Sequence, residues 1–217
     1  QTITFGSLAG KTYGAADFSV AASASSGLAV TFVSNDTDVC TVSGSTVTLV
    51  SVGTCSLTAN QGGSDDYSSA SGVTRTFSVA AKALTVAVTV SSKVYDRTTT
   101  ASISTAGSLS GVVSGDAVTV SNTGATFADK NVGAGKTVTL AGISLGGADA
   151  ANYTIATTAT GTAAITAKPL TLTGFAADDK TYNGSLSASI DNAGSLSGVV
   201  SGDTVTVSNT GAAFSDK

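Results

Sequence analysis

The residue types that usually carry out catalysis are sparse in this chain of 217 residues. The sequence contains no His and no Glu, so the commonest general bases and the commonest zinc ligand are missing. Ser and Thr make up almost a third of the residues, but a hydroxyl needs a neighbouring base to act as a nucleophile, and only Lys or Asp could serve. The composition predicts that the chain is not an enzyme and has no cofactor.

Three patterns still have the form of a binding or reactive site. The segment 133–137, Gly-Ala-Gly-Lys-Thr, is similar to the end of a phosphate-binding loop, but an earlier Gly is missing and a strand follows, which favours a hairpin turn. Asp178 and Asp179 form the best place for calcium, yet Asp also stabilises turns without a metal. Lys93 or Lys180 could form an amide cross-link, although a solvated Lys at a strand end is favoured. We predict no metal site and no catalytic residue.

Charge and hydropathy limit the possible partners. The net charge is −4 and the ten basic residues are scattered singly, whereas a nucleic-acid surface needs clustered Lys and Arg. No apolar run approaches the ~18 residues needed to span a bilayer. We therefore expect no nucleic-acid partner and no membrane insertion. The sequence opens without a signal-peptide pattern, so either such a segment has been removed or the sequence is an excerpt of a longer one.

Self-comparison reveals a tandem repeat. Residues 107–130 and 194–217 are identical at 21 of 24 positions, with an offset of 87. Looser similarity extends upstream of both blocks and into the first 80 residues. Such self-similarity at a fixed period is typical of repeat architectures. We expect three units, which cover residues 1–80, residues 81–167 and, as a partial copy, residues 168–217.

The tyrosines occur only at repeat-equivalent positions. Tyr13, Tyr95 and Tyr182 each end a Lys-x-Tyr signal, whereas Tyr67 and Tyr153 each follow Asp or Asn. These rings could line a sugar site. A buried ring whose hydroxyl holds a loop in place is the favoured interpretation, because a tyrosine used only at equivalent points is most simply structural.

The apolar pattern within each unit is typical of short β-strands. Val, Leu, Ala or Phe alternates with Thr or Ser, and turn signals rich in Gly, Asp and Ser recur at about 8–12 residues. We therefore predict an all-β fold of tandem Ig-like β-sandwich repeats in an elongated array, about 100 Å long if three are in line. The clearest predicted strands are 29–33, 45–49, 55–59, 136–140 and 203–207.

Several motifs resemble those of known bacterial repeats. Three of them, at 111–116 (Gly-Val-Val-Ser-Gly-Asp), 125–133 (Ala-Thr-Phe-Ala-Asp-Lys-Asn-Val-Gly) and 147–154 (Gly-Ala-Asp-Ala-Ala-Asn-Tyr-Thr), resemble the YDG-type repeat. The first unit, with Gln-Thr-Ile-Thr-Phe and Lys-Thr-Tyr-Gly, is similar to the related MBG (glycine-rich Ig-like) repeat. Arg97 departs from the family glycine, and Asn183 from its aspartate. The resemblance implies a stalk segment of a large secreted or surface-anchored adhesin.

The two cysteines, Cys40 and Cys55, are predicted to form a disulfide. A low-cysteine secreted chain with one nearby pair usually bridges it. In a plain meander the pair would lie two strands, or about 9.6 Å, apart, beyond the ~7 Å limit for bridging. The bridge therefore requires the chain to cross to the opposite sheet at residues 50–53.

The third unit is predicted to be incomplete. Its sequence ends at Lys217, the counterpart of Lys130, so nothing in it corresponds to residues 131–166. Those residues should supply about half of the inner faces of the second unit. Two explanations remain: the sequence is an excerpt of a longer array, which is favoured, or strands of a neighbouring molecule complete the unit.

These observations lead to an expected function. We expect a non-catalytic spacer of a bacterial surface or secreted adhesin, located extracellularly or on the cell surface. Its partners are expected to be neighbouring repeats of the same long chain and, in a fibre, other copies. The alternative is that the repeats themselves bind glycans or self-associate into an extracellular filament or biofilm matrix.

Overall fold

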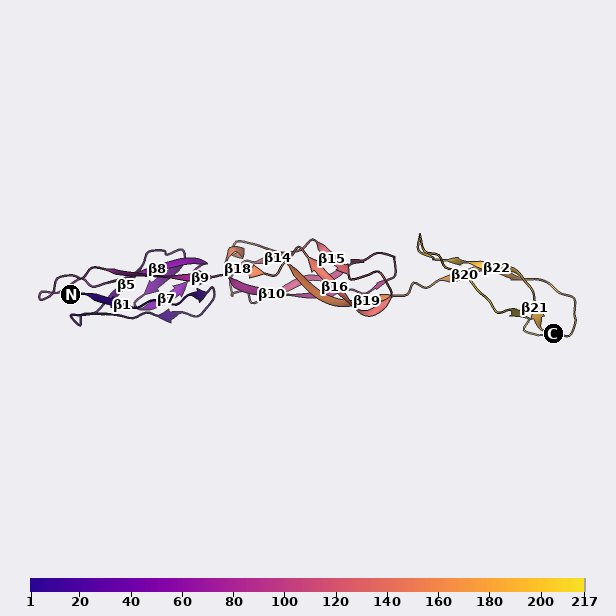
Figure 1. The fold of residues 1–217 in the computed structure, drawn as a ribbon, viewed down its shortest axis with the longest axis horizontal. Helices are drawn as coiled ribbons and strands as arrows, with labels where there is room; N and C mark the ends of the chain where they lie inside the picture. Colours follow the sequence, from indigo (N-terminus) through magenta and orange to yellow (C-terminus); the bar gives the residue numbers. More distant parts are fainter. Residues whose placement is uncertain (217) are drawn as a thin grey trace. The chain divides into compact units, whose positions relative to one another are not determined.

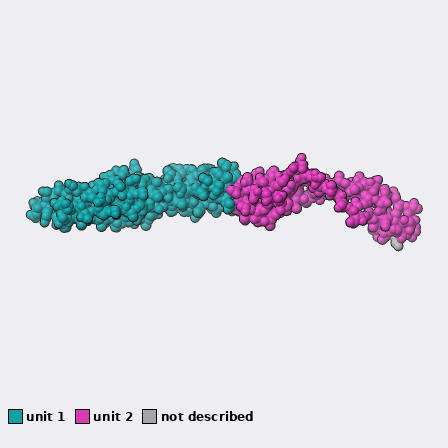
Figure 2. Space-filling model, in the orientation of Figure 1, with its two compact units in different colours: residues 1–89, 105–124, 140–160 teal, residues 90–104, 125–139, 161–217 magenta. Residues whose placement is uncertain are grey.

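A computed structural model describes residues 1–216, with every side chain except those of residues 104–106. The regular structure of the described residues is β-strand, apart from one 3-10 turn at Ala150–Asn152 (Figure 1). The predicted all-β class is therefore confirmed. None of the described helical segments is long and apolar enough to cross a membrane. The chain forms two compact units, residues 1–89, 105–124 and 140–160, and residues 90–104, 125–139 and 161–217 (Figure 2).

The N-terminal part of unit 1 contains three sheets that share one core. The alternation of apolar and hydroxyl residues buries one face of each strand, as Cys55, Leu57 and Ala59 do on one of them. The first sheet has the order β2 (Lys11–Thr12), β9 (Val73–Ala80), β8 (Gly53–Asn60) and β5 (Thr31–Ser34). The second has the order β3 (Phe18–Ser19), β7 (Thr46–Leu49) and β6 (Cys40–Ser43), and β1 (Ile3–Phe5) pairs with β4 (Ala22–Ala24).

Cys40 and Cys55 form a disulfide across this core, as predicted. Cys40 lies on β6 and Cys55 on β8, in different sheets, because the chain leaves one sheet after Leu49 and enters the other at Gly53. Their Cα atoms are 5.7 Å apart, within the range that a disulfide can span. Both side chains are fully buried, so the bridge connects the two sheets inside the core.

The rest of unit 1 comes from the second repeat. Leu84 and Tyr153 are buried in the same apolar cluster as the N-terminal core, and Val118 and Leu145 pack against it. One sheet has the order β13 (Ile103–Ser110), β10 (Lys82–Val90) and β18 (Tyr153–Ile155), and β14 (Thr119–Ser121) pairs with β17 (Ser144–Gly146).

Unit 2 contains a five-stranded sheet and two short strand pairs. In the five-stranded sheet, Phe127, Val138 and Ile165 are buried, whereas no described residue from 168 onward is. The sheet has the order β11 (Lys93–Val94), β19 (Thr158–Thr166), β16 (Gly133–Ala141), β15 (Gly124–Phe127) and β12 (Thr100–Ala101). The pairs are β20 (Thr171–Ala177) with β22 (Ile190–Ser197) and β21 (Ser187–Ala188) with β23 (Ala212–Ala213).

Two local predictions are wrong. Residues 133–137 lie within the strand β16 and not in a hairpin turn, because this segment pairs with both β15 and β19. Residues 203–207 form no strand, although the equivalent segment of the second repeat, residues 116–120, overlaps β14. The strand β14 exists through its pairing with β17, and the described part of the third repeat has no counterpart of β17. A strand needs a partner for its backbone groups, so the same residues do not form one here.

Candidate functional site

Short parallel strand pairs place the Lys-x-Tyr tyrosines at the end of their repeats. The strand β2 pairs with β9, and the Tyr13 N–H donates to the Ala80 carbonyl at 2.8 Å. In the second repeat β11 pairs with β19 in the same way, and the Tyr95 N–H donates to the Thr166 carbonyl at 2.8 Å. Ala80 is the last residue of the expected first repeat, and Thr166 lies one residue before the expected end of the second. Each tyrosine therefore lies where one repeat meets the next.

The partner of each tyrosine is the Asp that ends a Gly-Val-Val-Ser-Gly-Asp loop. The Asp116 N–H donates to the Val113 carbonyl at 3.1 Å, and the Asp203 N–H donates to the Val200 carbonyl at 3.0 Å. The glycine before each Asp has a positive φ, 99° in the second repeat and 88° in the third, which tight turns of this kind require. The loop thus holds its carboxylate in the same way in both repeats.

At the first junction, two tyrosines from different repeats share one carboxylate. The Tyr13 hydroxyl donates to Asp116 Oδ2 at 2.9 Å, and the Tyr153 hydroxyl donates to the same oxygen. The Tyr153 hydroxyl also accepts from the Val113 N–H at 2.9 Å, and the two rings pack edge to face with centroids 5.5 Å apart. Both rings are buried. Tyr13 and Tyr153 therefore confirm the prediction of buried rings whose hydroxyls hold a loop, whereas Tyr67 and Tyr182 are exposed and the prediction is wrong for them.

A second contact strengthens the first junction. The Val52 N–H, in the segment where the chain crosses between sheets, donates to Asn152 Oδ1 at 2.9 Å. Asn152 is buried, and a backbone N–H of the other repeat satisfies its side-chain oxygen. The Asn-Tyr pair at 152–153 therefore contributes two side chains to the same junction.

The environment of the carboxylate favours neutral tyrosines. Burial is the largest cause of a raised pKa for Tyr13. The hydrogen bond to Asp116 and the negative charge of Asp116 add to it, and together they raise the pKa of Tyr13 to about 12. Burial and the same carboxylate also raise the pKa of Tyr153. Both hydroxyls keep their protons at neutral pH and act as donors.

The second junction has the same tyrosine and aspartate with an added cation. The Tyr95 hydroxyl donates to Asp203 Oδ1 at 3.3 Å, and the Arg97 Nε lies 3.5 Å from the same oxygen. The Arg97 Nη1 donates to the Ser201 carbonyl at 3.1 Å. Arg97 has a φ of 68°, a backbone conformation that favours Gly, so an Arg at this position carries backbone strain. The contacts of its guanidinium with Asp203 and Ser201 offset that strain. Beside them lies a cavity of about 160 Å³, lined in part by Val132.

The lysines of the Lys-x-Tyr signals lie over aromatic rings. The Lys93 Nζ lies 5.6 Å from the Phe127 centroid and donates to Asp96 Oδ1 at 2.7 Å and to Thr98. The hydrogen bonds from Lys93 and then from Thr98 lower the pKa of Asp96 to about 2. The Lys93 side chain is only 18% exposed, so the prediction of a solvated lysine is wrong for this residue. Its neighbours hold it as an ion pair.

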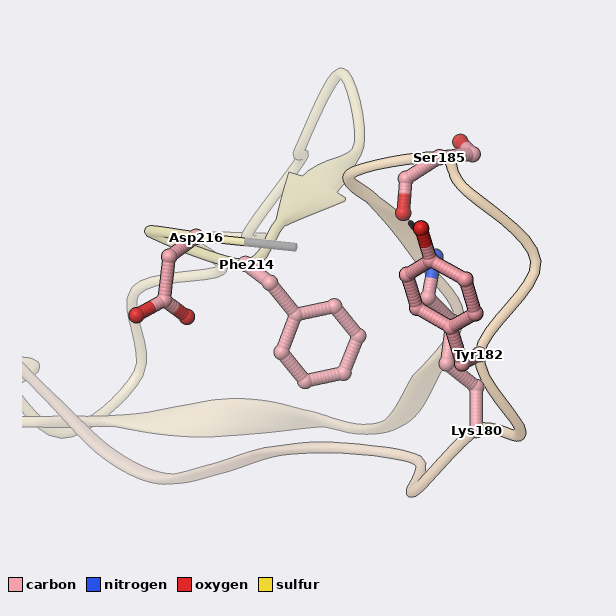
Figure 3. Close-up of a pocket in the computed structure, with 5 residues that line it drawn as sticks. All are labelled: Lys180, Tyr182, Ser185, Phe214 and Asp216. Carbon is pink, nitrogen blue, oxygen red and sulfur yellow. Dashed lines mark hydrogen bonds between the residues drawn. The ribbon is translucent and has the colours of Figure 1, made fainter.

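The third repeat carries an open version of the same cluster (Figure 3). The Lys180 Nζ lies 5.4 Å from the Phe214 centroid and donates to Asn183 Oδ1 at 3.2 Å. Tyr182 is 78% exposed, in contrast to the buried Tyr13. A pocket of about 230 Å³ in this repeat is lined by Lys180, Tyr182, Ser185, Phe214 and Asp216.

The other candidates from the sequence form no site in the structure. Asp178 and Asp179 are exposed, and within residues 1–216 no three His, Cys, Asp or Glu side chains gather where they could hold a metal ion. Lys136, in the segment similar to a phosphate-binding loop, pairs with Asp129 at 2.5 Å.

Sequence reasoning missed the tyrosine–aspartate pairing between repeats. Both motifs were visible in the sequence, because Lys-x-Tyr and Gly-Asp each recur from repeat to repeat. A linear pattern does not show, however, that the tyrosine of one repeat pairs with the Asp of the next. The two partners lie 103 residues apart at the first junction and 108 at the second.

The fold and these junctions define an all-β protein built from tandem repeats. The family model of the YDG domain matches residues 80–161 and 166–217, and the chain belongs to the YDG domain family. The chain matches no curated protein and no solved structure.

Proposed function

We propose that this chain is a non-catalytic spacer segment of a bacterial surface or secreted adhesin, built from Ig-like β-sandwich repeats. The proposal assigns an MBG-type repeat to residues 1–80, a YDG-type repeat to residues 81–167 and a partial one to residues 168–217. A spacer transmits force and keeps distance, so its working parts are the repeat cores and the junctions between them.

The tyrosine–aspartate pair that recurs at both junctions carries the proposal. A flexible tether needs no specific contact between consecutive units, whereas a stiff one does. Tyr13 with Asp116 and Tyr95 with Asp203 supply such a contact at equivalent places. At the first junction the buried rings and the Val52–Asn152 hydrogen bond add further resistance to bending.

The disulfide supports an extracellular location. Disulfides persist in oxidising compartments and are rare in the cytosol. The Cys40–Cys55 bridge joins two sheets of the first repeat and resists their separation under load. Few charges and many surface hydroxyls suit a chain segment that stays soluble without attracting charged partners.

Small-angle X-ray scattering on the full chain tests the spacer function. The expected particle is elongated, about 100 Å long for three units in line. The double variant Tyr13→Phe/Tyr95→Phe removes both hydroxyls and is expected to broaden the distribution of interatomic distances. Tyr67→Phe is the matched control, because Tyr67 is half exposed and its hydroxyl makes no hydrogen bond with the described residues. A near-spherical particle, or saturable binding to a panel of glycans, would refute the proposal.

A further inference from the structure

Asn183 is the only Asn of the chain that Gly follows directly. In such a pair the Gly backbone nitrogen can approach the carboxamide carbon of the preceding side chain, because Gly has no Cβ and adopts backbone angles that other residues avoid. Gly184 has a φ of 72°, and a Cβ added to it would meet no atom beyond its chain neighbours within 4 Å. Its N–H donates no hydrogen bond to a described residue, so this nitrogen is free to react.

Two hydrogen-bond donors point at the side-chain oxygen of Asn183. The Lys180 Nζ donates to Asn183 Oδ1 at 3.2 Å, and the Ser185 N–H donates to the same oxygen at 3.1 Å. An attack on the carboxamide carbon places negative charge on this oxygen. An ammonium and a backbone N–H aimed at such an oxygen stabilise the oxyanion of an acyl transfer. The turn therefore holds a polarised carboxamide directly before an accessible nitrogen.

The second repeat shows what a carboxylate does at the same position. Asp96 is the counterpart of Asn183, and its Oδ1 accepts from the Lys93 Nζ at 2.7 Å and from the Thr98 N–H at 2.9 Å. These hydrogen bonds lower the pKa of Asp96, so the donors favour a charged acceptor. Lys180, in contrast, forms no ion pair with a described residue. The donors around Asn183 are thus arranged as they are around a carboxylate.

Solvent access is a property of this turn in both repeats. The side chain of Asp96 is 51% exposed, although the chain continues into the third repeat beyond it. Asn183 and Gly184 are exposed as well. Water can therefore reach the carboxamide at residue 183.

We propose that Asn183 and Gly184 form a self-modifying site, at which the carboxamide of Asn183 is converted into a carboxylate. The Gly184 nitrogen loses its proton to water and bonds to Asn183 Cγ, the bond from Cγ to Nδ2 breaks, and ammonia leaves with that proton restored by solvent. The product is a cyclic imide. Water then adds to the imide, opens the ring and leaves an aspartyl or isoaspartyl residue. Neither an oxidant nor a second protein is needed.

The aspartyl product gives the third repeat the ion pair that the second repeat has from its sequence. Its carboxylate accepts from Lys180 and from the Ser185 N–H, as Asp96 accepts from Lys93 and Thr98. Hydrogen bonds of this charged kind are about twice as strong as those between neutral groups. The modification therefore tightens the turn after synthesis. The inference does not depend on the spacer function.

Peptide mapping by mass spectrometry tests the proposal. The full chain is incubated at neutral pH in water enriched in the heavy oxygen isotope and sampled over time. The expected result is incorporation of heavy oxygen at residue 183 while Asn192 remains an amide. Asn192 is the internal control, because it is exposed and its Oδ1 accepts from the Gly194 N–H at 2.8 Å, but Ala follows it and no described Lys donates to it.

Two variants separate the nucleophile from the oxyanion donors. Gly184→Ala is expected to slow the conversion about tenfold or more, because a Cβ hinders the attack. Gly174→Ala is its matched control, at a glycine of the same repeat with a φ of 70° and equally open space. Lys180→Met is expected to slow the conversion about tenfold, since one donor to the oxyanion is lost. Lys136→Met removes a Lys elsewhere and should leave the rate at residue 183 unchanged.

Hydrogen exchange tests the product independently of the rate. In Asn183→Asp the Ser185 N–H is expected to exchange about threefold more slowly than in the unaltered chain, because its acceptor becomes charged. Asn192→Asp is the control for added charge and should not slow exchange at Ser185. Conversion at residue 183 no faster than at Asn192, an unchanged rate in Lys180→Met, or unchanged exchange at Ser185 in Asn183→Asp would overturn the proposal.

Discussion

Removing the Tyr13 hydroxyl is the most direct way to measure the strength of the first junction. Tyr13→Phe keeps the buried ring and its edge-to-face packing on Tyr153, and removes only the donor to Asp116 at 2.9 Å. A hydrogen bond to a charged group contributes about 1.5–3 kcal/mol. The Asp116 carboxylate still accepts a hydrogen bond from the Tyr153 hydroxyl. Because Asp116 is partly exposed, water replaces part of the hydrogen bond that Tyr13 no longer donates. The expected cost in the free energy of unfolding is about 1–2 kcal/mol.

Urea unfolding followed by NMR through the methyl signals of Leu57 and Leu84 is the assay. These two residues lie in one buried cluster but belong to the first and second repeats. In the unaltered chain their transitions should coincide, and in Tyr13→Phe they should move apart, because the repeats become less coupled. A double-mutant cycle with Asp116→Ala is expected to give an interaction energy of about 1 kcal/mol.

The pH dependence provides a second readout of the same bond. The pKa of Tyr13 is about 12 in the folded chain, against about 10 for an unperturbed tyrosine. Below pH 10 the hydroxyl is protonated in both states. Between pH 10 and 12 the unfolded chain releases this proton and the folded chain retains it, so stability falls as pH rises. Tyr13→Phe should lessen this alkaline loss. If Tyr13→Phe matches the Tyr67→Phe control in both the urea and the pH experiments, the proposed coupling of the repeats is refuted.

Two further perturbations test other parts of the molecule. Reduction of the Cys40–Cys55 disulfide, which closes a loop of 15 residues, should cost the first repeat about 3 kcal/mol in urea unfolding. In Tyr13→Phe, whose repeats are less coupled, the Leu84 methyl transition should then move less than that of Leu57; equal shifts in this variant would contradict a junction that depends on the Tyr13 hydroxyl. Gly202→Ala should weaken the second junction more than Gly115→Ala weakens the first, because both glycines have a positive φ but only at Gly202 would the new Cβ collide with the Arg97 guanidinium. Thermal unfolding of the two variants compares them, and equal losses would mean that Arg97 moves aside at no cost.

Local sequence determined much of the fold. Strands over 45–49, 55–59 and 136–140 follow from the alternation of apolar and hydroxyl residues, because each strand buries one face. The repeat follows from self-similarity, and the YDG domain family model matches residues 80–161 and 166–217 in turn. The disulfide also followed from the sequence, once the chain was assumed to change sheets between its cysteines.

Only the tertiary structure decided which groups meet across repeats. The parallel pairing of β2 with β9 brings Tyr13 beside Ala80, and only then does its hydroxyl reach Asp116, 103 residues away. No local pattern encodes a contact whose geometry depends on how two repeats stack. The same reason explains the failure at residues 203–207, whose composition suits a strand. A strand is stable only beside a partner, so nearly identical residues form one in the second repeat and none in the third.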